Sequence, residues 1–234
     1  LLARGDEVVA LDRAPLAARA PRLHAHLVDL LDADAVAAAL ADAVARGVAL
    51  RHVVAIAGGA LPAEKACTDP AALPLDVFRA SLEQNLMTAW IVVQAALPHL
   101  RRVDGDRSIA LTSSTDALAS YGLPGYAAAK GALLGLVRSL AAPLGADGIR
   151  INAVAPGDVP TARNVREWAH VPGWYDRLRE ASVLDRLGTP EDVAATFLAL
   201  IDIPHLTGQT LIVDGGQTVP RPAGARRADP EEPA

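Results

Sequence analysis

The 234-residue sequence has a single cysteine and very few aromatic side chains. Because Cys67 stands alone, a disulfide within the chain is excluded, and this cysteine content is typical of a reducing compartment. Aromatic residues make up 3% of the chain and hydrophobic residues 51%, so a large core must be built from Ala, Leu and Val. The formal net charge is −5 and no basic stripe is present, which argues against nucleic acid or an anionic membrane as a partner.

Signals for membranes, secretion and metals are also missing. We expect no apolar run to reach membrane-spanning length, and no secretory signal is visible. With the lone cysteine, these absences predict a cytoplasmic location. The six histidines are scattered without the spacing of metal ligands, so no catalytic metal is expected.

Short apolar runs alternate with helical patterns along the chain. Strands are expected at 7–12, 25–29, 51–57, 108–112, 149–154 and 209–213, and helices at 32–45, 76–101, 126–145 and 190–202. This alternation predicts an α/β fold with a doubly wound parallel sheet. Residues 1–219 should form one domain, and the proline-rich segment 220–234 a disordered tail.

Tyr126 and Lys130 are four residues apart in a segment with few other polar side chains, twelve residues after Ser114. On a helix this spacing places the phenol and the ammonium on one face. A nearby positive charge lowers the pKa of a phenol, which then exchanges a proton with an alcohol or carbonyl. The alternative is an ordinary helical tyrosine beside a solvated lysine, because this spacing also occurs by chance.

Further motifs follow in a fixed order: Asn85 upstream, the segment 150–157 (RINAVAPG) after the helix, and the segment 206–216 (LTGQTLIVDGG) near the end. With Ser114, Tyr126 and Lys130, these motifs resemble the short-chain dehydrogenase/reductase family over most of the chain. The resemblance implies a Rossmann-like fold, a nicotinamide cofactor and an alcohol or ketone substrate. It also implies that Tyr126 is the acid/base and that Lys130 holds the nicotinamide ribose.

The start of the chain departs from that family. The resemblance implies an opening strand and a glycine-rich G-x-x-x-G-x-G turn, whereas Gly5 and Gly47 are the only glycines before Gly58. Residues 1–5 (LLARG) are typical of a helix end with its terminating glycine. We therefore expect the first strand to be missing from the middle of the sheet, between the strand ending at Asp12 and the strand near Arg51.

Cofactor contacts are expected at several strand ends. Asp12 ends a strand, where an acid bonds the adenosine ribose and repels a 2′-phosphate, which favours NAD over NADP. Arg13 follows directly, and the alternative is that it binds such a phosphate. By resemblance Asp29 and Leu30 flank the adenine. The remaining contacts implied by the resemblance are Ala57, Gly58, Tyr126, Lys130, Pro156, Gly157, the backbone of Val159 and the hydroxyl of Thr161.

Two assignments stay open at the catalytic residues. Ser114 fits the strand-end position of the family serine, but Ser113 has the commoner family distance from Tyr126. Asn85 lies beside the apolar stripe of its helix. Either it distorts the helix and bonds neighbouring backbone, or it holds a water that relays protons from Lys130 to solvent, as the resemblance implies.

A lid is expected at 162–187, which carries Trp168, Trp174 and Tyr175 in an otherwise aromatic-poor chain. These rings either cover an apolar substrate or only anchor the lid to the body. The small residues of 127–135 and the apolar strand 209–213 suggest association, and the resemblance implies a homotetramer.

The expected function is hydride transfer between NAD and a secondary alcohol or ketone. Alternatives are an NADP-dependent 3-oxoacyl-thioester reductase, disfavoured by Asp12, and a non-catalytic truncated member of the family. Without the missing strand and the glycine-rich turn, residues 1–234 alone are expected to be inactive, insoluble or partly unfolded, and unable to bind NAD. Calorimetry on the isolated chain tests this, since a cooperative transition that rises with added NAD contradicts it.

Overall fold

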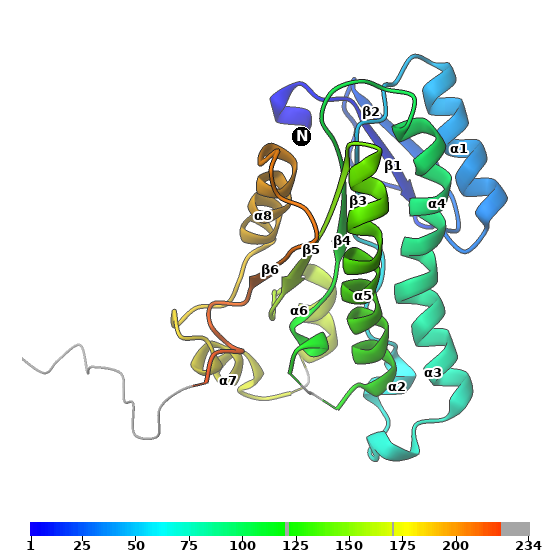
Figure 1. Cartoon of the computed structure of the whole chain (residues 1–234). Helices are drawn as coiled ribbons and strands as arrows, with labels where there is room; N and C mark the ends of the chain where they lie inside the picture. Colours follow the sequence, from blue (N-terminus) through cyan, green and yellow to red (C-terminus); the bar gives the residue numbers. More distant parts are fainter. Residues whose placement is uncertain (120–121, 170, 221–234) are drawn as a thin grey trace, which may run out of the picture.

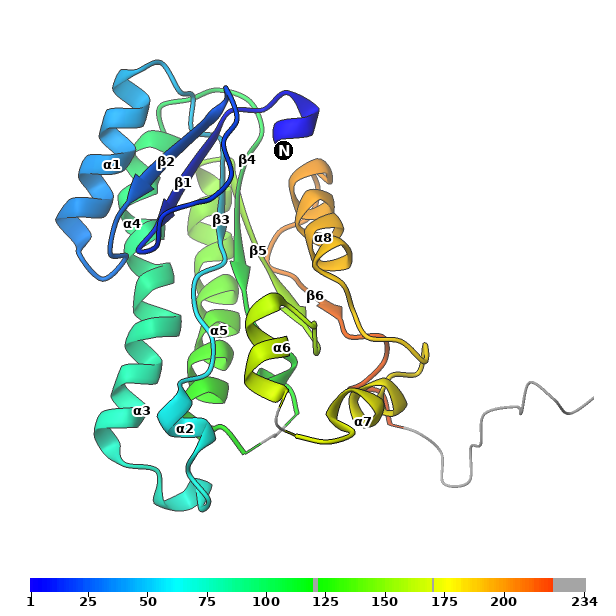
Figure 2. The same ribbon diagram turned by 180° about the vertical axis from the view of Figure 1, so that it is seen from behind.

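The computed structural model describes residues 1–119, 122–169 and 171–220, which form parallel strands with helices on both sides (Figures 1 and 2). The strands are β1 (Val8–Asp12), β2 (Leu23–Leu27), β3 (His52–Ala55), β4 (Arg107–Thr112), β5 (Ile149–Pro156) and β6 (Thr210–Val213). The α-helices are α1 (Ala33–Ala45), α2 (Pro62–Lys65), α3 (Leu75–Leu82), α4 (Thr88–Leu100), α5 (Pro124–Ala146), α6 (Ala162–Trp168), α7 (Trp174–Ala181) and α8 (Pro190–Asp202). Single 3₁₀ turns cover Leu2–Arg4, Pro70–Ala72 and Thr115–Ala117. The predicted alternation is confirmed, and the predicted tail beyond residue 220 lies outside the described residues.

The strands form two separate parallel sheets. β1 pairs with β2, and the second sheet has the order β3-β4-β5-β6. Within the described part of the chain no ladder joins β1 to β3. The break lies where the sequence analysis placed the missing strand. Gly5 ends the first 3₁₀ turn with a left-handed φ of 86°, so the predicted terminating glycine is found.

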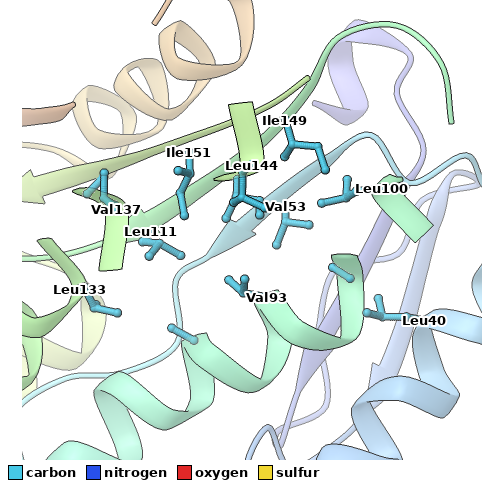
Figure 3. Close-up of a cluster of buried hydrophobic side chains, with 14 of the residues drawn as sticks. Leu40, Val53, Val93, Leu100, Leu111, Leu133, Val137, Leu144, Ile149 and Ile151 are labelled. Atoms are coloured by element: carbon cyan, nitrogen blue, oxygen red, sulfur yellow. The ribbon is translucent and has the colours of Figure 1, made fainter. Parts of the chain in front are cut away.

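The core has two layers because both faces of the larger sheet are covered. Helices α1, α4 and α5 pack on one face, where Leu40, Val93 and Leu133 meet strand residues such as Ile151 (Figure 3). Phe197 and Leu200 of α8 pack on the opposite face against alternate strand positions, Ala110 and Val154. Burial on both faces explains why these strands are continuous apolar runs rather than alternating ones.

The helix expected at 76–101 is interrupted. A π-helical turn, Glu83–Met87, separates α3 from α4, and it contains the fully buried Asn85. The Asn85 amide nitrogen donates to the carbonyl of Ser81 at 3.0 Å, one turn earlier. Expecting one regular helix was therefore wrong, and the distortion that was one of the two accounts of Asn85 is present.

Helix α5 is long and apolar enough, by length and composition, to span a membrane. The expectation that no segment reaches that length was therefore wrong. Its buried residues Ala129, Leu133 and Val137 belong to the core of the α/β domain. A core helix of a globular domain passes the same test of length and composition, so α5 is no sign of a membrane protein.

Candidate active site

The candidate site lies where neighbouring strands β3, β4 and β5 end. In a parallel sheet the carboxyl ends of the strands share one edge, which is where open α/β sheets bind ligands. Ser113 and Ser114 follow β4, and helix α5 starts beside them. The Ser113 hydroxyl donates to the carbonyl of Lys130 at 2.9 Å, which fixes the helix against the strand end.

Lys130 is only 2% exposed although it carries an ammonium group. Its Nζ donates to the carbonyl of Thr112 at 2.8 Å and lies 5.6 Å from the centroid of the Tyr126 ring. Burial lowers the pKa of Lys130 to about 8, and the negative charge of Asp116 partly opposes that shift. The predicted face that carries both Tyr126 and Lys130 is present.

The predicted direction of the Tyr126 pKa was wrong for the protein without a cofactor. Burial raises the pKa of Tyr126 to about 12, because phenolate is poorly solvated there. The Ser114 side chain opposes the rise of this pKa, and the charge of Asp116 adds to it. The Lys130 ammonium donates its hydrogen bond to the Thr112 carbonyl and not to the phenol, which explains why its charge does not set the pKa of Tyr126.

The two serines have different partners. The Ser113 hydroxyl donates to the backbone carbonyl of Lys130, whereas the Ser114 hydroxyl donates to Oδ2 of Asp116 at 2.8 Å and acts to lower the pKa of Tyr126. Ser114 also caps the 3₁₀ turn by accepting from the Asp116 backbone N–H. This geometry favours Ser114 as the serine that meets a substrate oxygen.

Two carboxylates at the site were not singled out from the sequence. Asp116 bonds Ser114, and Asp158 bonds Gln217, whose amide nitrogen lies 3.3 Å away. Burial raises the pKa of Asp116, against the Ser114 hydrogen bond, and burial followed by repulsion from Asp116 raises the pKa of Asp158. Their position after strand ends β4 and β5 was the available signal.

Asn85 and Gly58 are in close contact. The Asn85 side chain accepts from the backbone N–H of Gly59 at 2.7 Å and donates to the carbonyl of Gly59 at 3.1 Å. Gly58 has a φ of +143°, and a Cβ there would lie 2.5 Å from Oδ1 of Asn85 and 3.3 Å from Nζ of Lys130. The structure therefore places Gly58, Asn85 and Lys130 together, and the relay role of Asn85 stays a prediction.

The predicted adenosine-binding residues lie together at the ends of β1 and β2. Asp12 Oδ1 accepts from the N–H of Ala14 at 2.8 Å, and Asp29 Oδ1 accepts from that of Leu31 at 3.0 Å. The carbonyl of Asp12 accepts from the N–H of Val28, so the two strand ends are adjacent. Leu30 packs against the main core, and Arg13 is exposed.

The segment after β5 is held by close backbone packing. A Cβ on Gly157 would lie 2.9 Å from the Cα of Asp214, so only glycine fits there. Val159 is 8% exposed, and its carbonyl accepts from the side chain of Asn164 at 2.8 Å. The Thr161 hydroxyl caps α6 through the Asn164 N–H at 3.2 Å. Pro156 ends β5, and Ala57 is exposed beside Gly58.

The predicted lid contains α6 and α7. The ring centroid of Trp168 lies 5.5 Å from that of Trp174 and 6.3 Å from that of Tyr175, so the rings join the two helices. Glu167 of α6 forms ion pairs with Arg163 of the same helix and with Lys65 of α2. Residue 170 lies outside the described residues. These ring contacts all lie within the predicted lid, so anchoring of the lid to the body and contact with substrate both stay predictions.

Comparisons with known proteins identify the family of this chain. Residues 3–218 match the protein family described as enoyl-(acyl carrier protein) reductase. The protein of Rhizobium meliloti (strain 1021) named probable galactose dehydrogenase GalD is 32% identical over 190 residues, which are 80% of this chain and 72% of that one. The short-chain reductase protein NovJ of Streptomyces niveus is 41% identical over 51% of this chain and 47% of its own length.

Solved structures give the same result. An oxidoreductase of the short-chain dehydrogenase/reductase family from Burkholderia thailandensis superimposes with a TM-score of 0.81 at 35% identity, covering 93% of this chain and 85% of that one. The fold and these similarities define an oxidoreductase class whose members use nicotinamide cofactors. The chain belongs to the short-chain dehydrogenase/reductase family.

Similar structures contain either cofactor. ElxO with NADP bound has a TM-score of 0.77 at 26% identity, covering 84% of this chain and 79% of that one. A 3-oxoacyl-[acyl-carrier protein] reductase with bound NAD from Brucella melitensis has a TM-score of 0.72 at 29% identity, covering 83% and 71%. The family therefore supports NAD(P), and the choice between the two forms rests on residues of this chain.

The contact between Gly58 and Asn85 predicts different costs for two alanine substitutions. Gly58→Ala and Gly47→Ala both place alanine at positive φ, but a Cβ at Gly47 meets nothing within 4 Å. Gly58→Ala should lower the free energy of unfolding by about 1–3 kcal/mol more than Gly47→Ala does, because it displaces the buried, hydrogen-bonded amide of Asn85. Urea unfolding of the full-length protein measures both, and equal losses would contradict the contact.

Proposed function

We propose that the protein transfers a hydride between a nicotinamide cofactor and a secondary alcohol or ketone, with Tyr126 as the acid/base. The observation that carries this proposal is the buried Lys130 ammonium, which lies 5.6 Å from the centroid of the Tyr126 ring, with the Ser114 hydroxyl acting to lower the pKa of the same phenol. An ammonium has three donors, and among the described residues Thr112 takes one. The others suit the two hydroxyls of a nicotinamide ribose.

Proton transfer is the part of the reaction that these side chains perform. In reduction, Ser114 donates a hydrogen bond to the substrate carbonyl, and Tyr126 gives its phenol proton to the same oxygen as the C–H bond forms. The bound cofactor supplies the hydride, and in the reverse direction it accepts one. A Tyr126 pKa of about 12 keeps the phenol protonated at neutral pH, ready to donate. The charge of Lys130 stabilises the phenolate that is left.

Within this proposal NAD is the preferred cofactor. Asp12 is exposed at the end of β1 and lies next to the residue that follows β2. In the proposed complex its carboxylate would face the 2′-phosphate of NADP. Asp29, Leu30, Ala57, Gly58, Pro156, Gly157, Val159 and Thr161 are the proposed remaining contacts. Asn85 is proposed as the link from Lys130 to solvent.

A thioester substrate is the second candidate. The matching family description names an acyl-carrier-protein reductase, and the Brucella melitensis reductase that resembles this chain binds NAD. The experiment compares kcat/KM for a 3-hydroxyacyl thioester and for a simple secondary alcohol. The substrate with the higher kcat/KM identifies the substrate class.

We also propose a cytoplasmic homotetramer. Ile212 of β6 is 49% exposed, and a Cβ on Gly131 or Gly135 of α5 would meet nothing within 4 Å, so both surfaces are open to close packing. A monomeric mass by light scattering at micromolar concentration would contradict the tetramer.

Tyr126→Phe should reduce kcat of the full-length protein by about 10²–10⁴-fold, because phenylalanine has no proton to give. Cofactor reduction or oxidation, followed at the nicotinamide absorbance, measures the rate. Ser139→Ala, which removes an exposed hydroxyl from the same helix, is the control and should be unchanged. Retention of most activity by Tyr126→Phe would overturn the mechanism.

Asp12→Ser should narrow or reverse the preference for NAD over NADP, because it removes the charge that repels the 2′-phosphate. The ratio of kcat/KM values for the two cofactors is the measurement, with the exposed Asp104→Ser as control. A tenfold preference of the unsubstituted protein for NADP, about 1.4 kcal/mol, would assign the decisive contact to Arg13 instead.

A further inference from the structure

Glu64 is a buried acid that no motif in the sequence pointed out. It lies in the short helix α2 and is 1% exposed. Its Oε1 accepts from the backbone N–H groups of Gly125 at 2.7 Å and Tyr126 at 3.0 Å. Its Oε2 accepts from the hydroxyl of Ser81 at 3.0 Å. All three partners are distant in sequence, so Glu64 joins separate parts of the fold.

The start of α5 explains why such an acid is needed. The first N–H groups of a helix have no partner within it and attract negative charge. Leu123 occupies the N-cap position without a side-chain hydrogen bond, and Pro124 has no N–H to satisfy. Gly125 and Tyr126 therefore present the first free donors, and Glu64 accepts from both.

The packing around this contact leaves little freedom. A Cβ on Gly125 would lie 3.0 Å from the Cβ of Ser81 and 3.2 Å from Oε1 of Glu64, so glycine lets the three segments meet. Ser81 is fully buried, and its carbonyl accepts from the amide of Asn85. Hydrogen bonds thus run from the backbone of Tyr126 through Glu64 and Ser81 to Asn85.

We propose that Glu64 is a positioning residue that fixes the first turn of α5, and thereby sets where the Tyr126 phenol lies relative to Ser114 and Lys130. This inference rests on the proposed function, because it concerns the placement of the proposed acid/base. The negative charge of Glu64 also contributes to raising the pKa of Asp116, after burial as the main cause, so its influence reaches the site.

Three variants of the full-length protein test the proposal. Glu64→Ala removes both acceptors, and misplacing the phenol by about 1 Å should lower kcat roughly 100-fold. Glu64→Gln keeps one acceptor for the two N–H groups and should lower kcat much less, by about 2- to 10-fold. Glu191→Gln is the matched control, since Glu191 is an exposed acid in the first turn of α8.

Two measurements separate a positioning role of Glu64 from a general contribution to stability. The rate is expressed per cofactor-binding site, counted by titration, so that unfolded protein does not contribute. The dissociation constant of the cofactor should change less than threefold in Glu64→Gln and Glu64→Ala, because the change falls on kcat. If Glu64→Ala does not fold, Glu64→Gln still serves, with a kcat reduction of about 2- to 10-fold expected for the lost charge at the helix start.

The Tyr126→Phe background completes the test. If Glu64 acts through the phenol, its substitution should add little to the loss already caused by Tyr126→Phe. A multiplicative loss in the double variant, or unchanged kcat per site in both single variants, would overturn the proposal. Failure of the proposed function looks different, since Tyr126→Phe alone would then remain active.

Discussion

The candidate site depends on one buried contact, the hydrogen bond from the Lys130 ammonium to the carbonyl of Thr112 at the end of β4. The Ser113 hydroxyl, one residue further on, donates back to the carbonyl of Lys130. These two bonds fix one turn of α5 against the strand end. This turn carries Lys130 one turn after Tyr126, so it holds both proposed catalytic side chains beside the end of β4.

Burial gives this arrangement its electrostatic character. The described residues form no ion pair with Lys130, and its ammonium is almost fully removed from water. Its pKa is therefore lowered by burial to about 8, from an ordinary value of 10.5. Below pH 8 the folded state carries the cost of a buried charge. Between about pH 8 and 10.5 only the unfolded state keeps the proton, so this group makes folding more favourable as pH rises.

The sequence was sufficient for the order of elements and for the main catalytic candidates. Apolar runs that alternate with helical patterns predict a parallel sheet, because strands buried on both faces have few polar residues. Two local features identified the catalytic candidates: the four-residue spacing of Tyr126 and Lys130, and the position of Ser114 after a strand. Both can be found once the hydrophobic pattern has placed the helix and the strand. The break between the two sheets lies where the sequence predicted a missing strand, whereas the sheet face that α8 covers was not predicted.

Features that depend on distant contacts could not be predicted in this way. Glu64 reaches the start of α5 from 61 residues away, and nothing in the sequence around it indicates that contact. The π-helical turn depends on hydrogen bonds of Asn85 to Gly59, which belongs to another segment. The Tyr126 pKa was predicted in the wrong direction because a sequence shows a neighbouring charge but not the depth of burial.

The central claim is that burial at the end of β4 lowers the pKa of the Lys130 ammonium, which supports proton transfer by Tyr126, and the pKa of Lys130 tests that claim directly. Lysine is rare in this sequence, which contains Lys65 and Lys130, so labelling lysine with ¹³C at Cε gives few side-chain signals to resolve. Lys130→Met assigns the signal of the buried group. The cofactor-free, full-length protein should show that signal titrating near pH 8. An ordinary lysine pKa near 10.5 would contradict the account.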